Sequence, residues 1–278
     1  MSSDQIVTHY SRSDILARIA AALRDDGANP DHPTIETLAP YDQFHGRGLE
    51  ATIEVAGLMP ARATDHILDI GSGIGGPARY VARRFGCRVT GIDLTPEFCS
   101  AARELTRLVG LADRVQFESG NALAMPFAEA SFDGAYSMNV SMNIANKRAF
   151  YREIRRVLKP GAWLVLSEVA KGDGAALGYP TPWAATEETS FLSTPEETRQ
   201  ALADAGFEAI ELASSLEQAL EFGTRSRAAV ARGEKPPHRA VLLMQGEAAK
   251  AAMANTARGL AQGAIVPIEV RARKVVPA

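Results

Sequence analysis

The sequence is poor in cysteine, and it has neither a long apolar run nor an excess of charge of one sign. Two cysteines, Cys87 and Cys99, are too few for a disulfide framework or a metal cluster. We therefore expect no metal site, and we expect both thiols to pack as small apolar side chains. No run of roughly eighteen apolar residues is present, so no membrane insertion is predicted.

The charge balance argues against a nucleic-acid partner. The 278 residues contain 30 Lys and Arg against 33 Asp and Glu, for a net charge of −3. Nucleic-acid binding draws most of its affinity from a basic excess that neutralises phosphates, and the densest basic stretch, 152–159, has the spacing of a solvated helix face. The first residues lack the basic and apolar regions of a secretion signal, so we expect a cytoplasmic protein.

From His66 onward, short apolar segments alternate with amphipathic ones. The predicted strands are 66–70, 88–93, 114–118, 132–137 and 163–168, and the predicted helices are 77–85, 96–109 and 148–158. Alternation of this kind is typical of an α/β fold in which a mostly parallel sheet carries helices on both faces. We therefore predict a Rossmann-like fold.

Two flanking regions have a different character. Residues 1–60 read as an N-terminal helical arm or lid, with helices at 13–23 and 48–58 and breakers at 27–33. Residues 61–278 form the expected main domain, which continues with a helix at 195–205 and strands at 207–212 and 264–272. Two alanine-rich helical stretches, split near 233–237, make a C-terminal helical embellishment around 214–262.

The strongest local pattern is LDIGSGIGG, residues 68–76, where the first strand passes into the first helix. Glycines there allow a tight turn and the close approach of a ligand to the main chain. Gly71, Gly73 and Gly76 also satisfy the dinucleotide fingerprint, so an NAD-dependent oxidoreductase is one alternative. Asp69 favours another ligand, because a dinucleotide fold normally has an apolar residue at that position.

Polar residues follow the second and third strands. Asp93 is placed to accept hydrogen bonds from both hydroxyls of a ribose, each contributing roughly 1.5–3 kcal/mol, although it could instead cap the next helix. Asn121 could accept a hydrogen bond from an adenine amino group, or it could be a turn asparagine. Leu94 and Leu123 would flank the adenine ring.

Taken together, the segments 68–76, 91–94, 120–127, 131–133 and 156–161 resemble the class I S-adenosylmethionine-dependent methyltransferases. The resemblance covers roughly residues 40–170. It implies a seven-stranded sheet whose last strand is antiparallel, S-adenosylmethionine as the cofactor, and S-adenosylhomocysteine as the product. The cofactor-binding residues that it implies are Gln43, Asp69, Gly71, Ser72, Gly73, Asp93, Leu94, Asn121, Ala122 and Ser137.

The segments 41–48, 142–144 and 182–183 are similar to a bacterial small-molecule branch that contains sarcosine and dimethylglycine N-methyltransferases, with phosphoethanolamine and tocopherol or sterol methyltransferases nearby. This likeness implies a small-molecule acceptor, methylated on an amine nitrogen. The chain departs from that branch at Asn139, where relatives often have histidine, at Arg47, which interrupts a glycine pair, and at Asn121, which replaces a commoner aspartate. An O- or C-methyltransferase of a phenolic, sterol-like or natural-product acceptor stays an alternative, as does an inactive methyltransferase-like protein.

Methyl transfer from a sulfonium is an in-line displacement that depends mainly on positioning, worth roughly 7–11 kcal/mol. A base is needed only when the acceptor arrives protonated. His45 is the first candidate for that base, and Tyr41 could orient the acceptor or contact a cationic amine. The residues expected to bind the acceptor are Met138, Asn139, Met142 and Trp183. A homodimer is possible.

Overall fold

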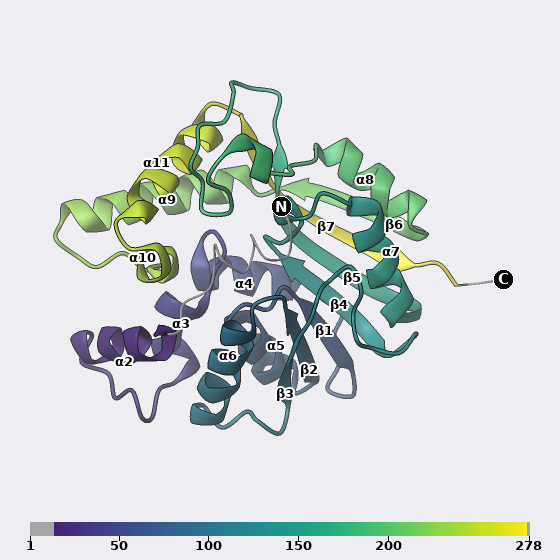
Figure 1. Cartoon of the computed structure of the whole chain (residues 1–278), viewed down its shortest axis with the longest axis horizontal. Helices are drawn as coiled ribbons and strands as arrows, with labels where there is room; N and C mark the ends of the chain where they lie inside the picture. Colours follow the sequence, from purple (N-terminus) through teal and green to yellow (C-terminus); the bar gives the residue numbers. More distant parts are fainter. Residues whose placement is uncertain (1–13, 277–278) are drawn as a thin grey trace.

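A seven-stranded sheet forms the centre of the structure, a computed structural model that describes residues 14–276 (Figure 1). Its strand order is β3-β2-β1-β4-β5-β7-β6, and β7 runs antiparallel to both of its neighbours. This order confirms the predicted mostly parallel sheet with an antiparallel last strand, and it differs from the 3-2-1-4-5-6 order of dinucleotide-binding folds. The strands are β1 (His66–Ile70), β2 (Arg88–Asp93), β3 (Val115–Ser119), β4 (Phe132–Met138), β5 (Leu158–Lys171), β6 (Phe207–Ser214) and β7 (Ile265–Lys274).

Helices cover both faces of the sheet because its central strands are apolar on both sides. In β1, Leu68 and Ile70 face one cluster, which contains α7 (Lys147–Val157) and α8 (Pro195–Asp204). Ile67 faces the other cluster, which contains α4 (Gly48–Gly57), α5 (Gly76–Phe85) and α6 (Pro96–Leu108). Each of these three side chains is fully buried, which contributes roughly 1.5–3 kcal/mol apiece. Both cysteines are buried and free, as expected.

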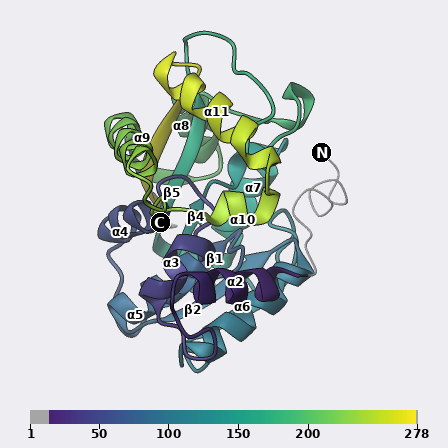
Figure 2. The ribbon, with the colours of Figure 1, turned by 90° about the vertical axis from the view of Figure 1, so that its left-hand side faces the viewer.

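Two groups of helices that are far apart in the sequence lie side by side (Figure 2). The N-terminal group contains α2 (Ile15–Asp25) and α3 (Ile35–Asp42), and the C-terminal group contains α9 (Leu216–Ala231), α10 (Ala240–Gln245) and α11 (Ala248–Ala261). Leu38 of α3, Phe98 of α6 and Met244 of α10 belong to one buried cluster. The C-terminal group therefore rests partly on the N-terminal helices.

The sequence reading missed α3 and counted one helix too few in the C-terminal group. Helix α3 contains Pro40 and follows a run of breakers, but Thr34 and Thr37 close a capping box at its start. In the C-terminal group, Gly246 has a φ of +58° and separates α10 from α11. Strand β5 also begins earlier than predicted, because Leu158 already pairs with Phe132 of β4. None of the helices within residues 14–276 has both the length and the apolar character needed to span a bilayer.

Candidate functional site

The glycine loop between β1 and α5 lies at the edge of the sheet where the parallel strands end. Gly71 has a φ of +72°, and a Cβ at this position would lie 2.2 Å from Cγ2 of Val140. A Cβ at Gly76 would lie 2.4 Å from the carbonyl oxygen of Asp42. Both contacts are shorter than any side chain allows, so the loop takes glycine at these two positions to pack against the 140 turn and the end of α3.

A cavity of about 270 Å³ opens beside this loop, between the ends of β1, β2 and β4. Eight of the residues expected to bind the cofactor or the acceptor line it, and Phe44 adds a wall from the segment after α3. These eight are Gly71, Gly73, Asp93, Leu94, Asn121, Ala122, Met138 and Asn139, and they are joined by Leu123. Met138 was expected in the acceptor pocket but belongs to this first cavity.

Asp93 ties the glycine loop to the end of β2. One carboxylate oxygen accepts from the Gly73 N–H at 2.8 Å, and the other accepts from the Thr95 N–H at 2.9 Å. Burial raises the pKa of Asp93. Each oxygen has a second lone-pair direction, so the carboxylate can also accept from the two hydroxyls of a ribose. The side-chain oxygen of Asn121 accepts a hydrogen bond from the Leu123 N–H at 2.9 Å, an arrangement that asparagine commonly forms in turns.

Two buried hydroxyls beside the loop, Oγ of Ser72 and Oγ of Ser137, lack hydrogen-bond partners among the described residues. The Asp69 carboxyl lies beside the Tyr136 hydroxyl, its neighbour across the β1–β4 pairing, and the two groups interact. Burial raises the pKa of Asp69 to about 7. Unpaired buried polar atoms are uncommon in native proteins, so the two serine hydroxyls are candidates for contact with a polar ligand. Asp69, Ser72 and Ser137 are not among the described residues that line either cavity.

A second, larger cavity of about 470 Å³ lies between the sheet edge and helices α9 to α11. Of the predicted residues, His45, Asn139, Met142 and Trp183 line it. Its wall is mostly apolar, and no Asp or Glu is among the described residues that form it. Its cations are engaged by neighbours: Arg47 pairs with Glu54 at 2.7 Å, and Arg227 donates to Thr224 at 3.1 Å.

The two cavities adjoin at Phe44 and Asn139, which line both. Asn139 has a φ of +56°, a left-handed conformation that asparagine tolerates better than most residues. With its amide oriented to satisfy both ends, its nitrogen donates to the Ser167 carbonyl at 3.3 Å and its oxygen accepts from the Gly46 N–H at 3.3 Å. Asn139 therefore fastens the 43–48 segment to β5 at the boundary between the cavities.

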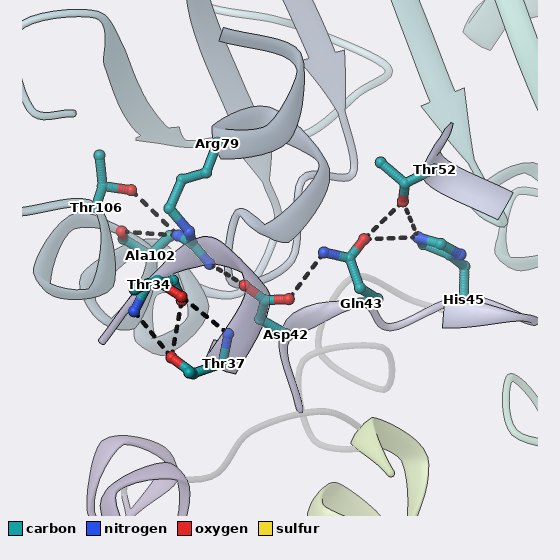
Figure 3. Close-up of polar contacts among 9 residues, drawn as sticks. All are labelled: Thr34, Thr37, Asp42, Gln43, His45, Thr52, Arg79, Ala102 and Thr106. Atoms are coloured by element: carbon teal, nitrogen blue, oxygen red, sulfur yellow. Dashed lines mark hydrogen bonds and ion pairs between the residues drawn. The ribbon is translucent and has the colours of Figure 1, made fainter. Parts of the chain in front are cut away.

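A buried chain of polar contacts leads from α5 to His45 (Figure 3). Arg79 donates to Oδ2 of Asp42 at 2.8 Å, and the Gln43 amide donates to Oδ1 of the same carboxylate at 2.8 Å. The Thr52 hydroxyl donates to Oε1 of Gln43 at 2.6 Å. Gln43 was expected to bind the cofactor; it lines neither cavity and instead lies inside this chain.

Both ring nitrogens of His45 lie close to protein groups. Nε2 is 3.0 Å from Oγ1 of Thr52, and Nδ1 is 3.1 Å from the carbonyl oxygen of Gly46. A neutral imidazole carries a single N–H, so the tautomer of His45 decides which of these two nitrogens donates. Burial, helped by the charge of Arg47, lowers the pKa of His45 to about 4.

Tyr41 lies away from both cavities. Its hydroxyl donates to a carboxylate oxygen of Asp26, and the Arg239 guanidinium lies 4.6 Å from the centre of its ring. Arg239 also donates from its main chain to the Pro40 carbonyl at 2.8 Å. Tyr41 thus joins the N-terminal helices to the segment before α10, and the structure does not bring it to the acceptor cavity.

His238 is a cavity residue that the sequence reading missed. It follows Pro236 and Pro237 in the break between α9 and α10, and it lines the larger cavity. A histidine after a proline pair, between two apolar helical stretches, was the only signal in the sequence. Nothing in local spacing places this segment against His45, because the contact joins residues almost two hundred positions apart.

Part of the chain is similar to known methyltransferases. Residues 68–166 match the model described as a methyltransferase domain. A 24-methylenesterol C-methyltransferase 2 from Oryza sativa is 41% identical over 114 residues, covering 41% of this chain and 31% of that protein. The O-methyltransferase resE from Aspergillus sclerotiorum is 31% identical over 165 residues, covering 58% of this chain and 61% of its own. The chain thus spans less than two thirds of each of these relatives.

Solved structures share the fold. A protein described as the [4+2]-cyclase SpnF has a TM-score of 0.72 and 23% identity, covering 100% of this chain and 98% of its own. A phosphoethanolamine N-methyltransferase 2 from Haemonchus contortus, in complex with phosphomonomethylethanolamine and S-adenosylhomocysteine, has a TM-score of 0.70 and 21% identity over 94% of this chain and 60% of its own. Residues 68–166 therefore resemble a methyltransferase domain, and the sheet of this chain has the fold of these solved structures.

Proposed function

We propose that the protein transfers a methyl group from S-adenosylmethionine to a small, mostly apolar molecule, and that the atom methylated is a hydroxyl oxygen. The observation that carries this proposal is the pair of adjoining cavities. The smaller one gathers the glycine loop and Asp93, and the larger one is apolar and has no carboxylate in its described wall. They meet at Phe44 and Asn139, where donor and acceptor would face each other.

The cofactor supplies a methyl group already activated on a sulfonium. Asp93 would accept from the ribose hydroxyls while it holds Gly73. Leu94, Ala122 and Leu123 would enclose the adenine ring, with Asn121 at its edge. The Asp69 carboxyl and the unpaired hydroxyls of Ser72 and Ser137 would receive the polar amino-acid end. Gln43 would act indirectly, by fixing the segment that carries Phe44.

The larger cavity supports an apolar acceptor. Its wall includes Phe44, Met142, Trp183, Phe222 and Leu260, and its volume of about 470 Å³ lies within the range of ordinary ligand pockets. The predicted arm of residues 1–60, of which residues 14–60 are described, would act as a lid, because its 43–48 segment closes one side of this cavity. The embellishment around 214–262 would close the opposite side, since α9 to α11 supply much of the wall.

The electrostatics of this cavity favour a hydroxyl over an alkyl amine. An amine with a pKa near that of lysine, about 10.4, carries a proton at pH 7, and losing that proton before transfer costs about 4–5 kcal/mol. The cavity offers no carboxylate to stabilise an ammonium ion. Its two histidines have pKa values lowered by burial to about 4 for His45 and about 3 for His238, so neither would take that proton.

An amine nitrogen, the acceptor atom expected from the sequence, is the second candidate. The aromatic walls at Trp183 and Phe222 favour it, because ring faces attract organic cations without a carboxylate. In either case Phe44 and Asn139 would align the acceptor with the methyl carbon, and the helical cap would exclude water.

The test uses S-adenosylmethionine whose methyl group carries deuterium. The purified protein is incubated with this donor and a panel of matched naphthols, naphthylamines and alkyl amines, and products are identified by mass. Since a fold neighbour is described as a cyclase, the readout follows the methyl group itself. Labelled methyl on a naphthol oxygen supports the proposal. Label on amines alone would support methyltransferase activity but overturn the proposal that the acceptor atom is a hydroxyl oxygen. Absence of transfer to any acceptor would contradict both the methyltransferase activity and the hydroxyl acceptor.

A further inference from the structure

We propose that His238 is the group that accepts the acceptor's hydroxyl proton, and that the acceptor therefore presents an O–H donor to the wall of the cavity formed by the segment between α9 and α10. This inference rests on the proposed function and assigns a residue to its proton transfer. It differs from the expectation drawn from the sequence, in which His45 is the base.

The two histidines that line the larger cavity differ in their hydrogen-bond partners. His45 has a neighbour for each ring nitrogen, Thr52 on one side and the Gly46 carbonyl on the other. His238 has none: both of its ring nitrogens are buried and lack a hydrogen-bond partner among the described residues, although part of the residue reaches solvent. A buried imidazole nitrogen without a partner is unfavourable, so a ligand that supplies a partner gains affinity on binding.

A neutral imidazole has one N–H and one bare nitrogen. Neither nitrogen of His238 has a partner among the described residues, and Nδ1 packs against Gly48, so the tautomer protonated on Nδ1 leaves Nε2 as the bare nitrogen for a hydroxyl donor. Burial lowers the pKa of His238 to about 3, and the charge of His45 contributes, so the bare nitrogen persists at neutral pH. A hydroxyl can donate to it, whereas an ether or a ketone cannot.

Gly48 keeps the His238 ring in place. A Cβ at this glycine would lie 3.1 Å from Nδ1 and 3.2 Å from Cβ of His238, and Gly48 has a φ of +53°. The ring therefore packs over the first residue of α4, on the same 45–48 segment that carries His45 and Arg47. Its position is fixed by this packing, which covers Nδ1 and leaves Nε2 as the nitrogen for a ligand.

The proton transfer balances as follows. A lone pair of the acceptor oxygen forms the bond to the methyl carbon as the carbon–sulfur bond breaks, and that bond's electron pair stays on sulfur. The hydroxyl proton, which becomes strongly acidic as the oxygen is alkylated, moves to the bare nitrogen of His238 and gives an imidazolium. The imidazolium returns the proton to solvent when the product leaves.

The test compares two ligands that differ only at the oxygen. Protein saturated with S-adenosylhomocysteine is titrated with 2-naphthol and with 2-methoxynaphthalene, which has the same aromatic body but no O–H. Wild type should prefer 2-naphthol by about tenfold, because only the naphthol satisfies the buried nitrogen. His238→Phe, which keeps a ring over Gly48, should bring the two affinities within about twofold. Ser226→Ala is the matched control, since the Ser226 hydroxyl also lacks a partner in this wall, and it should keep the preference.

Each outcome decides between distinct explanations. A preference that survives in His238→Phe and disappears in Ser226→Ala would move the role to Ser226 and overturn the proposal. Equal binding of both ligands to wild type, or binding of neither, would overturn it as well. Failure to bind S-adenosylhomocysteine would instead overturn the proposed function. As a kinetic check, added imidazole should restore turnover of a naphthol acceptor in His238→Ala but not in Ser226→Ala, which a merely structural role would not predict.

Discussion

The pH dependence of cofactor affinity should report the ionisation of the Asp69 carboxyl group. Burial raises its pKa to about 7, and the neighbouring charge of Asp93 adds to this, so in the free protein the group is largely protonated at pH 5.5. If the positively charged end of the cofactor lies beside it, binding requires the ionised form. Affinity should therefore rise with pH as Asp69 loses its proton.

The size of this effect follows from the pKa. At pH 5.5 about 3% of Asp69 is ionised, and at pH 7.0 about half is, so the association constant should rise about 15-fold over this range. The ligand's own amino group, with a pKa near 7.7–8.0, stays mostly protonated throughout. The assay is calorimetric titration with S-adenosylhomocysteine at four pH values, in two buffers that differ in ionisation enthalpy, which also counts the proton released on binding.

Asp69→Asn is the control for this experiment. It keeps the shape of the side chain and removes the titration, so its affinity should change by less than about twofold across the same range. A wild-type affinity that does not vary between pH 5.5 and 7.0, with no proton release, would show that the ionisation of Asp69 is unconnected with cofactor binding. A pH dependence that persists unchanged in Asp69→Asn would assign it to another group.

Five substitutions test other parts of the site and the residues around it. Asp93→Ala should weaken cofactor binding at least tenfold in calorimetry, because a ribose would lose both acceptors; an unchanged dissociation constant would remove it from the site. Arg79→Met should lower the free energy of unfolding by about 3–5 kcal/mol in urea titrations, since it leaves a buried carboxylate unpaired, whereas Arg83→Met, at an exposed pair, should change it by less than about 1 kcal/mol. His45→Ala should leave cofactor affinity nearly intact but lower turnover, because the 43–48 segment loses the contact of His45 with Thr52. Tyr41→Phe should lower the free energy of unfolding by about 1 kcal/mol and leave turnover unchanged, because it removes only the hydrogen bond to Asp26. A large loss of turnover in Tyr41→Phe would restore its expected catalytic role.

Local patterns in the sequence were enough for the sheet and the cofactor cavity. Strands β1 and β2 begin and end where their apolar runs do, and the glycine loop follows at once. Gly71, Gly73 and Asp93 come together because parallel strands bring their carboxyl ends to one edge, so chain order alone indicates their proximity. The features that decide this cavity are close in sequence or fixed by topology.

The acceptor cavity could not be read in the same way. Its wall joins the 44–47 segment to residues after 214, and no local periodicity specifies that contact. His238 was missed because its neighbour in space, Gly48, is far away in the chain. Tyr41 was expected to contact the acceptor because it belongs to the 41–48 segment that is similar to relatives, yet α3 turns its ring toward Arg239. Packing between helices determines these positions, and short sequence motifs do not predict that packing.

The central claim is that the smaller cavity binds S-adenosylmethionine. The most direct measurement is isothermal titration of the purified protein with S-adenosylmethionine and S-adenosylhomocysteine, with NAD as the control ligand. The account predicts one-to-one binding of both sulfur ligands with micromolar dissociation constants and no heat from NAD. Absence of binding by either sulfur ligand, or binding of NAD, would contradict it.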